Sequence, residues 1–178
     1  NGTVFFAHLL FPHDPFIYDA NCKIRPDPNT WKIIYGPLPG ANSAQLRALR
    51  YKYYLAQDIC AEQQLNNLFI ALQKAGIYQT ATIIVHGDHG ARIGVNWPYV
   101  SQTHQLTRQD FNDYFVTLFA SKIPGQTEGS FNQPEDLQSL LANDLTQITG
   151  KKVEAPKNNL FVFLYPDDGN KLMVKMPI

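Results

Sequence analysis

Residues 80–90 read TATIIVHGDHG, an apolar, β-branched run that ends on an Asp-His pair between two glycines. A continuous apolar run predicts a strand that is buried on both faces, as in parallel sheets. Asp88 and His89 follow the end of this strand, which is where open α/β sheets bind their ligands. A carboxylate beside an imidazole offers two ligands to Zn or Mn, and Gly87 and Gly90 permit the turn that brings them together. The alternative is a turn with a capping Asp88 and a surface His89.

Extended and helical patterns alternate along the rest of the chain. Asn42 or Ser43 is a suitable N-cap for a long helix, and Gly76 is a suitable stop. The expected elements are a strand over residues 3–10, a Pro- and Gly-rich loop over 11–40, a helix over 42–75, a strand over 80–85, a short turn led by Asp110, an apolar run over 114–120, a helix over 134–150 and a hairpin over 160–176. The apolar faces expected for the two helices are Leu65, Leu68, Phe69 and Leu72, and Leu137, Leu140, Leu141 and Leu145. We therefore expect an α/β fold, a mixed sheet layered with helices, with a C-terminal β-hairpin.

Length and charge narrow the class of protein. With 178 residues and 44% hydrophobic content, the chain can bury one core, so we expect one domain. Fifteen basic residues balance fifteen acidic residues, which argues against nucleic acid or an anionic membrane as a partner. The sequence has no run of 18 apolar residues, so we expect no membrane contact by this segment. A nucleotide-binding α/β domain is a poor alternative, because no glycine-rich phosphate motif occurs.

His13 is the second candidate for chemistry. It lies between Pro12 and Asp14-Pro15, and prolines restrict the backbone that carries the imidazole. A histidine held in place can donate a hydrogen bond or a proton to an oxygen of a substrate. The alternative is a solvent-facing histidine in a proline-rich loop.

Three segments together resemble the C-terminal half of a sulfatase-like hydrolase or transferase of the alkaline phosphatase superfamily. They are HLLFPHDPF at residues 8–16, YLAQDICAEQQLNNLFIAL at 54–72 and HGDHG at 86–90. The resemblance implies an alkaline-phosphatase-like fold, of which residues 1–178 form the C-terminal portion. It also implies that Asp88 and His89 bind a divalent metal, Zn, Mn or Ca, and that His13 contacts the transferred anionic group of the substrate.

The same resemblance implies a class of substrate and a location for the rest of the active site. Its substrate would be an anionic ester of the sulfate or phosphate type, and the remaining metal ligands and the nucleophile would lie N-terminal to Asn1. Alone, the segment would bind metal weakly and turn over little substrate. The parent protein would be extracytoplasmic and membrane-anchored. His86 stands where relatives more often carry Gln or Ser, and we assign no role to it or to His104.

Cys22 and Cys60 are the two cysteines of the chain, and their spacing does not suggest a structural zinc site. In an exported protein, a bond between them would attach the proline-rich loop to the long helix. We expect this disulfide, and the alternative is a pair of free buried thiols.

Two functions remain open. The first is part of a metal-dependent enzyme, and the second is a non-enzymatic binding or interaction module that retains half of the fold. They differ in geometry, because the enzyme requires Asp88, His89 and His13 to converge at one end of the sheet. In a repurposed fold the pair would be occluded or would diverge.

Overall fold

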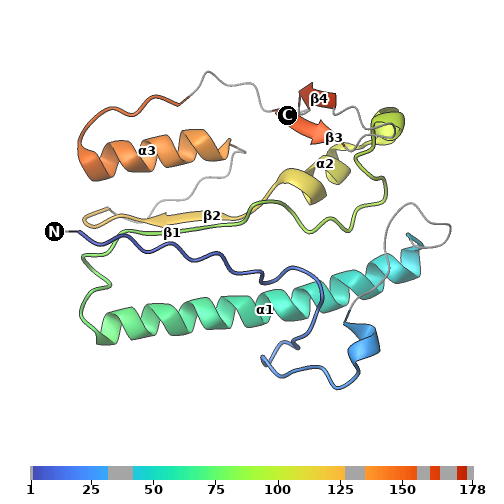
Figure 1. The fold of residues 1–178 in the computed structure, drawn as a ribbon, viewed down its shortest axis with the longest axis horizontal. Helices are drawn as coiled ribbons and strands as arrows, with labels where there is room; N and C mark the ends of the chain where they lie inside the picture. Colours follow the sequence, from blue (N-terminus) through green and yellow to red (C-terminus); the bar gives the residue numbers. More distant parts are fainter. Residues whose placement is uncertain (1, 32–41, 127–134, 156–160, 165–171, 176–178) are drawn as a thin grey trace. The chain divides into compact units, whose positions relative to one another are not determined.

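A computed structural model describes residues 2–31, 42–126, 135–155, 161–164 and 172–175 (Figure 1). The chain divides into two compact units, residues 1–71 and 72–178, and each is described by itself. The division does not test the expectation of one sulfatase-like domain, which stays a prediction.

The first unit is built on helix α1, Ala44–Lys74, and on the irregular segment that precedes it. Ser43 Oγ accepts a hydrogen bond from the amide of Leu46 (3.3 Å), so Ser43 caps the start of the helix. Gly76 has a φ of 73°, which is the left-handed conformation that ends helices. Both ends of this helix therefore agree with the sequence prediction.

The buried face of α1 is not the leucine-rich stripe that the sequence suggested. Arg50, Gln57 and Cys60 are its buried residues, whereas the side chain of Leu68 is 51% exposed. Spacings of seven and three residues place these buried residues on one face of the helix. They are buried by contact with the segment before the helix, a tertiary contact that periodicity alone does not show.

That segment is irregular, as predicted, over its described part. It includes a 3-10 helix, η1 (Pro28–Thr30), and an isolated bridge between Tyr18 and Ile24. Residues 32–41 of the predicted loop lie outside the described residues.

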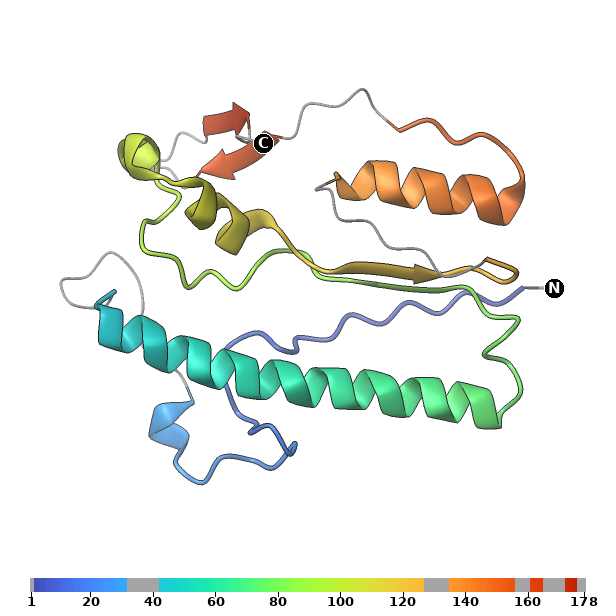
Figure 2. The same cartoon turned by 180° about the vertical axis from the view of Figure 1, so that it is seen from behind.

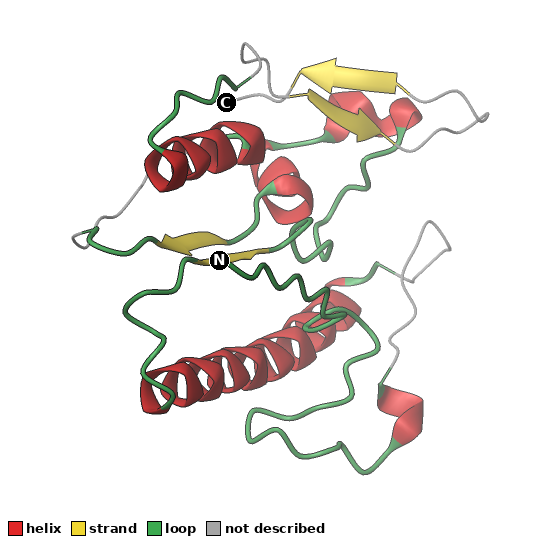
Figure 3. Ribbon diagram, turned by 60° about the vertical axis from the view of Figure 1, so that its left-hand side comes forward, coloured by secondary structure: helices red, strands yellow, loops and turns green. Residues whose placement is uncertain are grey.

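The strand predicted over residues 3–10 is wrong. Residues 2–10 carry no strand and are drawn as loop in Figure 3. The apolar side chains of Val4, Phe5 and Phe6 are 93%, 91% and 86% exposed. A strand needs a neighbouring strand to satisfy its backbone groups, and apolar composition alone does not provide one.

The second unit contains β1, Ile83–His86, which pairs with β2, Phe119–Lys122. The pairing is antiparallel, with Ile83 opposite Lys122 and His86 opposite Phe119. The residues of β1 are half-buried apart from His86, which is exposed. The β-branched run thus forms a strand, but the predicted parallel-type strand buried on both faces is wrong. Its neighbour comes from the segment after α2, and the two strands run in opposite directions as an antiparallel ladder.

Helix α2, Arg108–Phe115, follows the 3-10 helix η2, Val100–Gln105, and replaces the short turn predicted around Asp110. Phe111 is buried in the core of this unit and packs against apolar neighbours on η2 and α2 and between them. These neighbours are Val100, Leu106 and Phe115.

Helix α3, Leu137–Thr149, begins after its N-cap Asp136 and ends at Gly150, in agreement with the predicted stop. Pro134, the predicted start, lies outside the described residues. Figures 1 and 2 show α3 alongside β2, and Ser121 Oγ of β2 donates to Asp144 Oδ1 of α3 (3.2 Å). The predicted leucine face is only partly correct. The buried residues of α3 include Ser139, Ala142 and Asp144, and Leu145 is 44% exposed.

The predicted C-terminal hairpin is confirmed for its strands, β3 (Phe161–Leu164) and β4 (Leu172–Lys175), which pair antiparallel. Its turn lies outside the described residues. The α/β content predicted from the sequence is therefore present, with antiparallel pairing of β1 with β2 and of β3 with β4. The alkaline-phosphatase-like arrangement stays a prediction.

Candidate functional site

Asp88 and His89 lie in the loop that leaves the end of β1. The amide of Gly87 donates to the carbonyl of Leu118 (3.0 Å), and the amide of Gly90 donates to the carbonyl of Tyr114 (3.0 Å). These bonds attach both ends of the Asp-His pair to α2 and to the segment between α2 and β2. The pair is therefore carried on a short loop with fixed ends.

The contacts of the imidazole of His89 define its tautomer. His89 Nδ1 is 2.7 Å from the carbonyl oxygen of Gly90, and a carbonyl only accepts, so Nδ1 carries the proton. In the neutral ring Nε2 then carries the lone pair, and this atom is 3.7 Å from Asp88 Oδ1. The side chain of His89 is 20% exposed and that of Asp88 is 77% exposed. An imidazole that donates Nδ1–H to a backbone carbonyl is the usual arrangement of a metal-binding histidine.

The spacing of these donors can be compared with the requirement of one ion. Two ligands held 2.0–2.1 Å from a tetrahedral zinc ion lie about 3.3–3.4 Å apart. The observed 3.7 Å between His89 Nε2 and Asp88 Oδ1 is a few tenths of an ångström longer, and the exposed Asp88 has room to close it. The spacing of these two atoms is therefore close to what a shared divalent ion requires, and this loop would supply two of its ligands. Within the described ranges, no group of three or more His, Cys, Asp or Glu side chains is arranged to hold a metal.

Asp113 of α2 holds the backbone that follows the pair. Its Oδ2 accepts from the amides of Ile93 (2.6 Å) and Gly94 (2.6 Å), and its carbonyl accepts from the amide of Arg92 (3.1 Å). Charge-assisted hydrogen bonds of this kind are about twice as strong as neutral ones. Asp113 therefore fixes the path of the chain shortly beyond Asp88 and His89.

Asp110, one turn earlier on α2, holds the next part of the same loop. Its Oδ1 accepts from the amides of Val95 and Asn96 (3.1 Å each), and its Oδ2 accepts from Asn96 Nδ2 (2.9 Å). Its Oδ2 also accepts from the amide of Thr107 (2.9 Å), while Thr107 Oγ1 accepts from the amide of Asp110, so the two form a capping box.

The surroundings of Asp110 set its ionisation. Burial acts to raise the pKa of this carboxyl, but the hydrogen bonds from Asn96 and Thr107 outweigh burial and hold the pKa below its ordinary value of 3.8. Only 3% of Asp110 is exposed, so the charged carboxylate is stable there because of these donors. Sequence reasoning missed the roles of Asp110 and Asp113. The Thr107-x-x-Asp110 spacing was the available signal for the first of them.

Gly90 is needed because the backbone of α2 and of the residue after it approaches closely. A Cβ at this position would lie 2.2 Å from the carbonyl oxygen of Asp113 and 2.8 Å from that of Val116. Both neighbours are backbone atoms, which cannot rotate away as a side chain can. The glycine predicted to permit a turn therefore also permits close packing of the loop on α2.

His13 lies in the first unit, on the segment before α1. Its Nδ1 is 2.6 Å from the carbonyl oxygen of Asp14 and 3.1 Å from Asp14 Oδ1, so Nδ1 carries the proton in this ring as well. The side chain is 47% exposed. Because Asp88 and His89 belong to the second unit, the expected convergence of the three residues stays a prediction.

The two other histidines of the second unit, His86 and His104, are exposed. His86 ends β1 with Nδ1 3.1 Å from the carbonyl oxygen of Gly87, and His104 lies in η2 with Nε2 3.4 Å from Gln105 Nε2. Neither contact joins a histidine to Asp88 or His89, and their roles stay unassigned.

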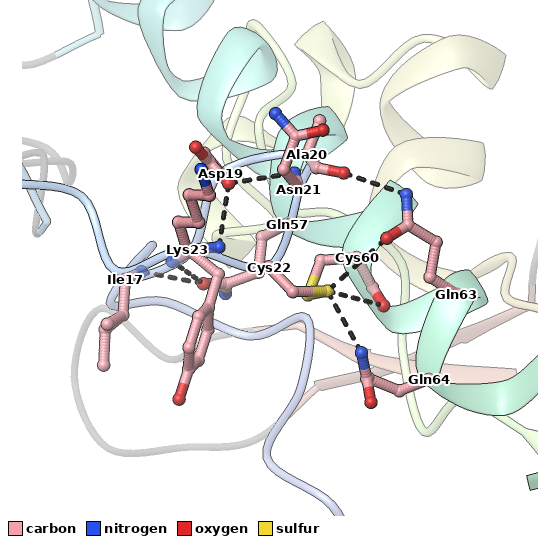
Figure 4. The surroundings of a disulfide bond; sticks show 11 residues. Ile17, Asp19, Ala20, Asn21, Cys22, Lys23, Gln57, Cys60, Gln63 and Gln64 are labelled. Atoms are coloured by element: carbon pink, nitrogen blue, oxygen red, sulfur yellow. Dashed lines mark hydrogen bonds between the residues drawn. A yellow bond between two sulfur atoms is a disulfide. The ribbon is translucent and has the colours of Figure 1, made fainter. Parts of the chain in front are cut away.

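The disulfide predicted between Cys22 and Cys60 is confirmed (Figure 4). It joins the segment before α1 to the buried face of the helix, and it is compatible with an extracytoplasmic location. Among the described residues, no helix is both long enough and apolar enough to span a membrane.

The chain was compared with known protein families, proteins and structures. The chain matches no protein-family model, no curated protein and no solved structure with significant similarity. The resemblance to sulfatase-like enzymes therefore stays a prediction.

Proposed function

We propose that the chain is part of a metal-dependent, sulfatase-like hydrolase or phospho- or sulfo-group transferase. The observation that carries the proposal is the orientation of His89. Its Nδ1–H is directed to the Gly90 carbonyl, and its Nε2 lies 3.7 Å from a carboxylate oxygen of Asp88. The distance between these two atoms is within a few tenths of an ångström of the spacing that two ligands of one zinc ion have. The attachment of the following loop by Asp110 and Asp113 supports the proposal, because metal ligands must be held in position.

In the proposed site, Asp88 and His89 hold a divalent ion, which when bound polarises the transferred group and stabilises its developing negative charge. His13 steadies or protonates an oxygen of the substrate through Nε2, while Nδ1–H remains directed to Asp14. Histidine suits this task because it exchanges protons near neutral pH. The nucleophile and the remaining metal ligands belong to residues outside this chain, so the chain alone binds metal weakly and has negligible turnover.

Calorimetric titration with Zn²⁺ or Mn²⁺ tests the metal site. We expect weak binding by the wild-type chain and no binding by Asp88→Asn or His89→Ala. His104→Ala is the matched control, because it removes an exposed histidine of the same unit and should leave binding unchanged. Equal loss in all three variants, or no loss in the first two, would contradict the assignment of the ligands.

The role of His13 is tested in the complete enzyme. His13→Ala should leave the metal bound but lower turnover by about 10²–10⁴, the usual contribution of a positioned proton-transfer group. An enzyme whose activity does not respond to a chelator would refute the metal-dependent function.

The second candidate, a binding or interaction module, is favoured by the exposure of Val4, Phe5 and Phe6. Contiguous exposed apolar side chains are typical of surfaces that another protein segment covers. This function predicts that Asp88→Asn and His89→Ala change neither metal binding nor any activity, so the same titration separates the two candidates.

A further inference from the structure

Gln57 of α1 is a polar side chain in a buried position. Only 1% of the residue is exposed, although it lies in the middle of a helix that is otherwise largely in contact with solvent. A buried amide is costly unless its donors and acceptor are all used. The partners of Gln57 therefore show what this residue does in the fold.

The partners lie on either side of His13. Gln57 Nε2 donates to the carbonyl of His13 itself (2.8 Å) and to that of Pro12 (3.0 Å). Gln57 Oε1 accepts from the amides of Ile17 (2.7 Å) and Tyr18 (3.1 Å). Since the donor and acceptor edges of an amide are distinct, these bonds fix both the position and the direction of the segment that carries the imidazole.

Other contacts attach the same segment to α1 without involving the His13 backbone. The disulfide from Cys60 to Cys22 lies one helical turn beyond Gln57, and Figure 4 shows both side chains directed toward residues 17–23. Arg25 donates to the carbonyl of Phe16 (2.7 Å), and its guanidinium carbon is 3.4 Å from the centre of the Tyr53 ring. The segment therefore remains attached to the helix if the amide of Gln57 is removed.

We propose that Gln57 is the positioning residue for His13. The disulfide and Arg25 hold the segment on α1, and the amide of Gln57 sets where the backbone of His13 lies relative to the helix. The positioning of the His13 backbone by Gln57 follows from hydrogen bonds within the first unit. An effect of Gln57 on substrate binding rests on the function proposed for His13. An imidazole displaced by about 1 Å loses much of its catalytic effect, so this residue would act on the reaction without touching the substrate.

Two substitutions and a matched control test the proposal in the chain. Gln57→Leu keeps most of the side-chain volume but removes every hydrogen-bonding atom, and Gln57→Glu keeps the acceptor but removes the donor that serves Pro12 and His13. Gln63→Leu is the control, because Gln63 lies on the same helix and its Nε2 donates to the carbonyl of Ala20 in the same segment (2.9 Å), but the residue is exposed. Formation of the disulfide and the fluorescence of Trp31 establish that each variant retains the first unit.

The primary measurement is the tautomer of the His13 ring, read from nitrogen chemical shifts above about pH 8.5, where an ordinary histidine is neutral. Wild type and Gln63→Leu should show the Nδ1–H form that the contact with Asp14 requires. Gln57→Leu and Gln57→Glu should shift toward the mixture of tautomers found in a solvated ring. An unchanged tautomer in both Gln57 variants would overturn the proposal.

A second measurement separates this inference from the proposed function. Inorganic phosphate, added to the metal-free chain, should shift the His13 signals of wild type and Gln63→Leu, and should bind Gln57→Leu about tenfold more weakly or worse. If phosphate leaves the wild-type signals unchanged while the tautomer still changes in Gln57→Leu, the positioning role stands and the anion-binding role of His13 fails. If phosphate binds wild type and Gln57→Leu equally, Gln57 has no functional role as a positioning residue.

Discussion

Replacing Asp110 with asparagine should destabilise the second unit far more than the same change at another helix cap. The new amide side chain would still offer Oδ1 to the amides of Val95 and Asn96, but its NH₂ group cannot accept from Thr107 or from the side chain of Asn96. Each charge-assisted hydrogen bond is worth about 1.5–3 kcal/mol, and donors left unsatisfied in a buried site carry their desolvation cost. Because neighbouring bonds are not additive, we expect a loss of about 2–4 kcal/mol in the free energy of unfolding.

The matched control is Asp136→Asn, at the N-cap of α3. Asp136 Oδ1 accepts from the amide of Ser139 (2.8 Å), and its Oδ2 accepts from Ser139 Oγ (2.6 Å). Asparagine caps helices as well as aspartate does, and the serine hydroxyl can accept from the new NH₂ group, so this change should cost about 0.5 kcal/mol or less. Unfolding in urea is followed by the fluorescence of Trp97, whose ring centre is 6.0 Å from that of Tyr114. A Trp31→Phe background removes the signal of the first unit, because these are the two tryptophans of the chain.

The pH dependence gives an independent check of the same reasoning. The pKa of Asp110 is lowered in the folded state, so its contribution is fully present above the unfolded value of about 3.9 and is lost as pH falls through the lower folded pKa. The stability difference between wild type and Asp110→Asn should therefore be constant from about pH 5 to 7 and shrink below about pH 4. A cost equal to that of Asp136→Asn, or a difference that persists undiminished in acid, would refute the role assigned to Asp110.

Three further predictions concern other parts of the chain. Removing the disulfide with Cys22→Ser and Cys60→Ser should cost about 4 kcal/mol on the chain-entropy account of a 38-residue separation, and thiol titration of the unfolded, non-reduced wild type should find no reactive thiol. Gly90→Ala should cost about 1–3 kcal/mol and weaken Zn²⁺ binding, because its Cβ would meet the Asp113 carbonyl, whereas Gly2→Ala, which has open space, should be neutral in both assays. Asp58→Asn should be more stable than wild type at pH 7 and equal to it below about pH 4. Burial and the nearby Glu62 raise the pKa of Asp58 in the folded state. The wild-type protein therefore loses stability as pH rises from the unfolded pKa of Asp58 to this higher folded pKa. A stability difference between the two proteins that grows in acid would contradict this account.

The sequence predicted the elements whose limits are set by local interactions. The cap at Ser43 and the stops at Gly76 and Gly150 define helix ends within a few residues, and the β-branched run at β1 marks a strand wherever its partner lies. The partner itself was not predictable from the run. Antiparallel pairing with β2 depends on the path of α2, a long-range feature that residue patterns do not encode.

The candidate site was predictable to a similar degree. Adjacency alone identified Asp88 and His89 as a pair, and the disulfide followed from the two cysteines and the exported class that the resemblance implied. The residues that hold these features in place were missed. Gln57 and Asp113 act through the backbone of segments distant in sequence, and such contacts leave no periodic or spaced signal.

The carboxylates of Asp110 and Asp113 also restrict how the site can recognise an anion. Four consecutive amides, from Ile93 to Asn96, are directed at these two side chains. Runs of backbone amides commonly form concave nests that bind phosphate or the oxyanion of a reacting group. Here the amides of Ile93 to Asn96 already bind the carboxylates of Asp110 and Asp113. If this loop binds an anion as proposed, these amides are not available to it, so recognition would depend on side chains rather than on the path of the loop.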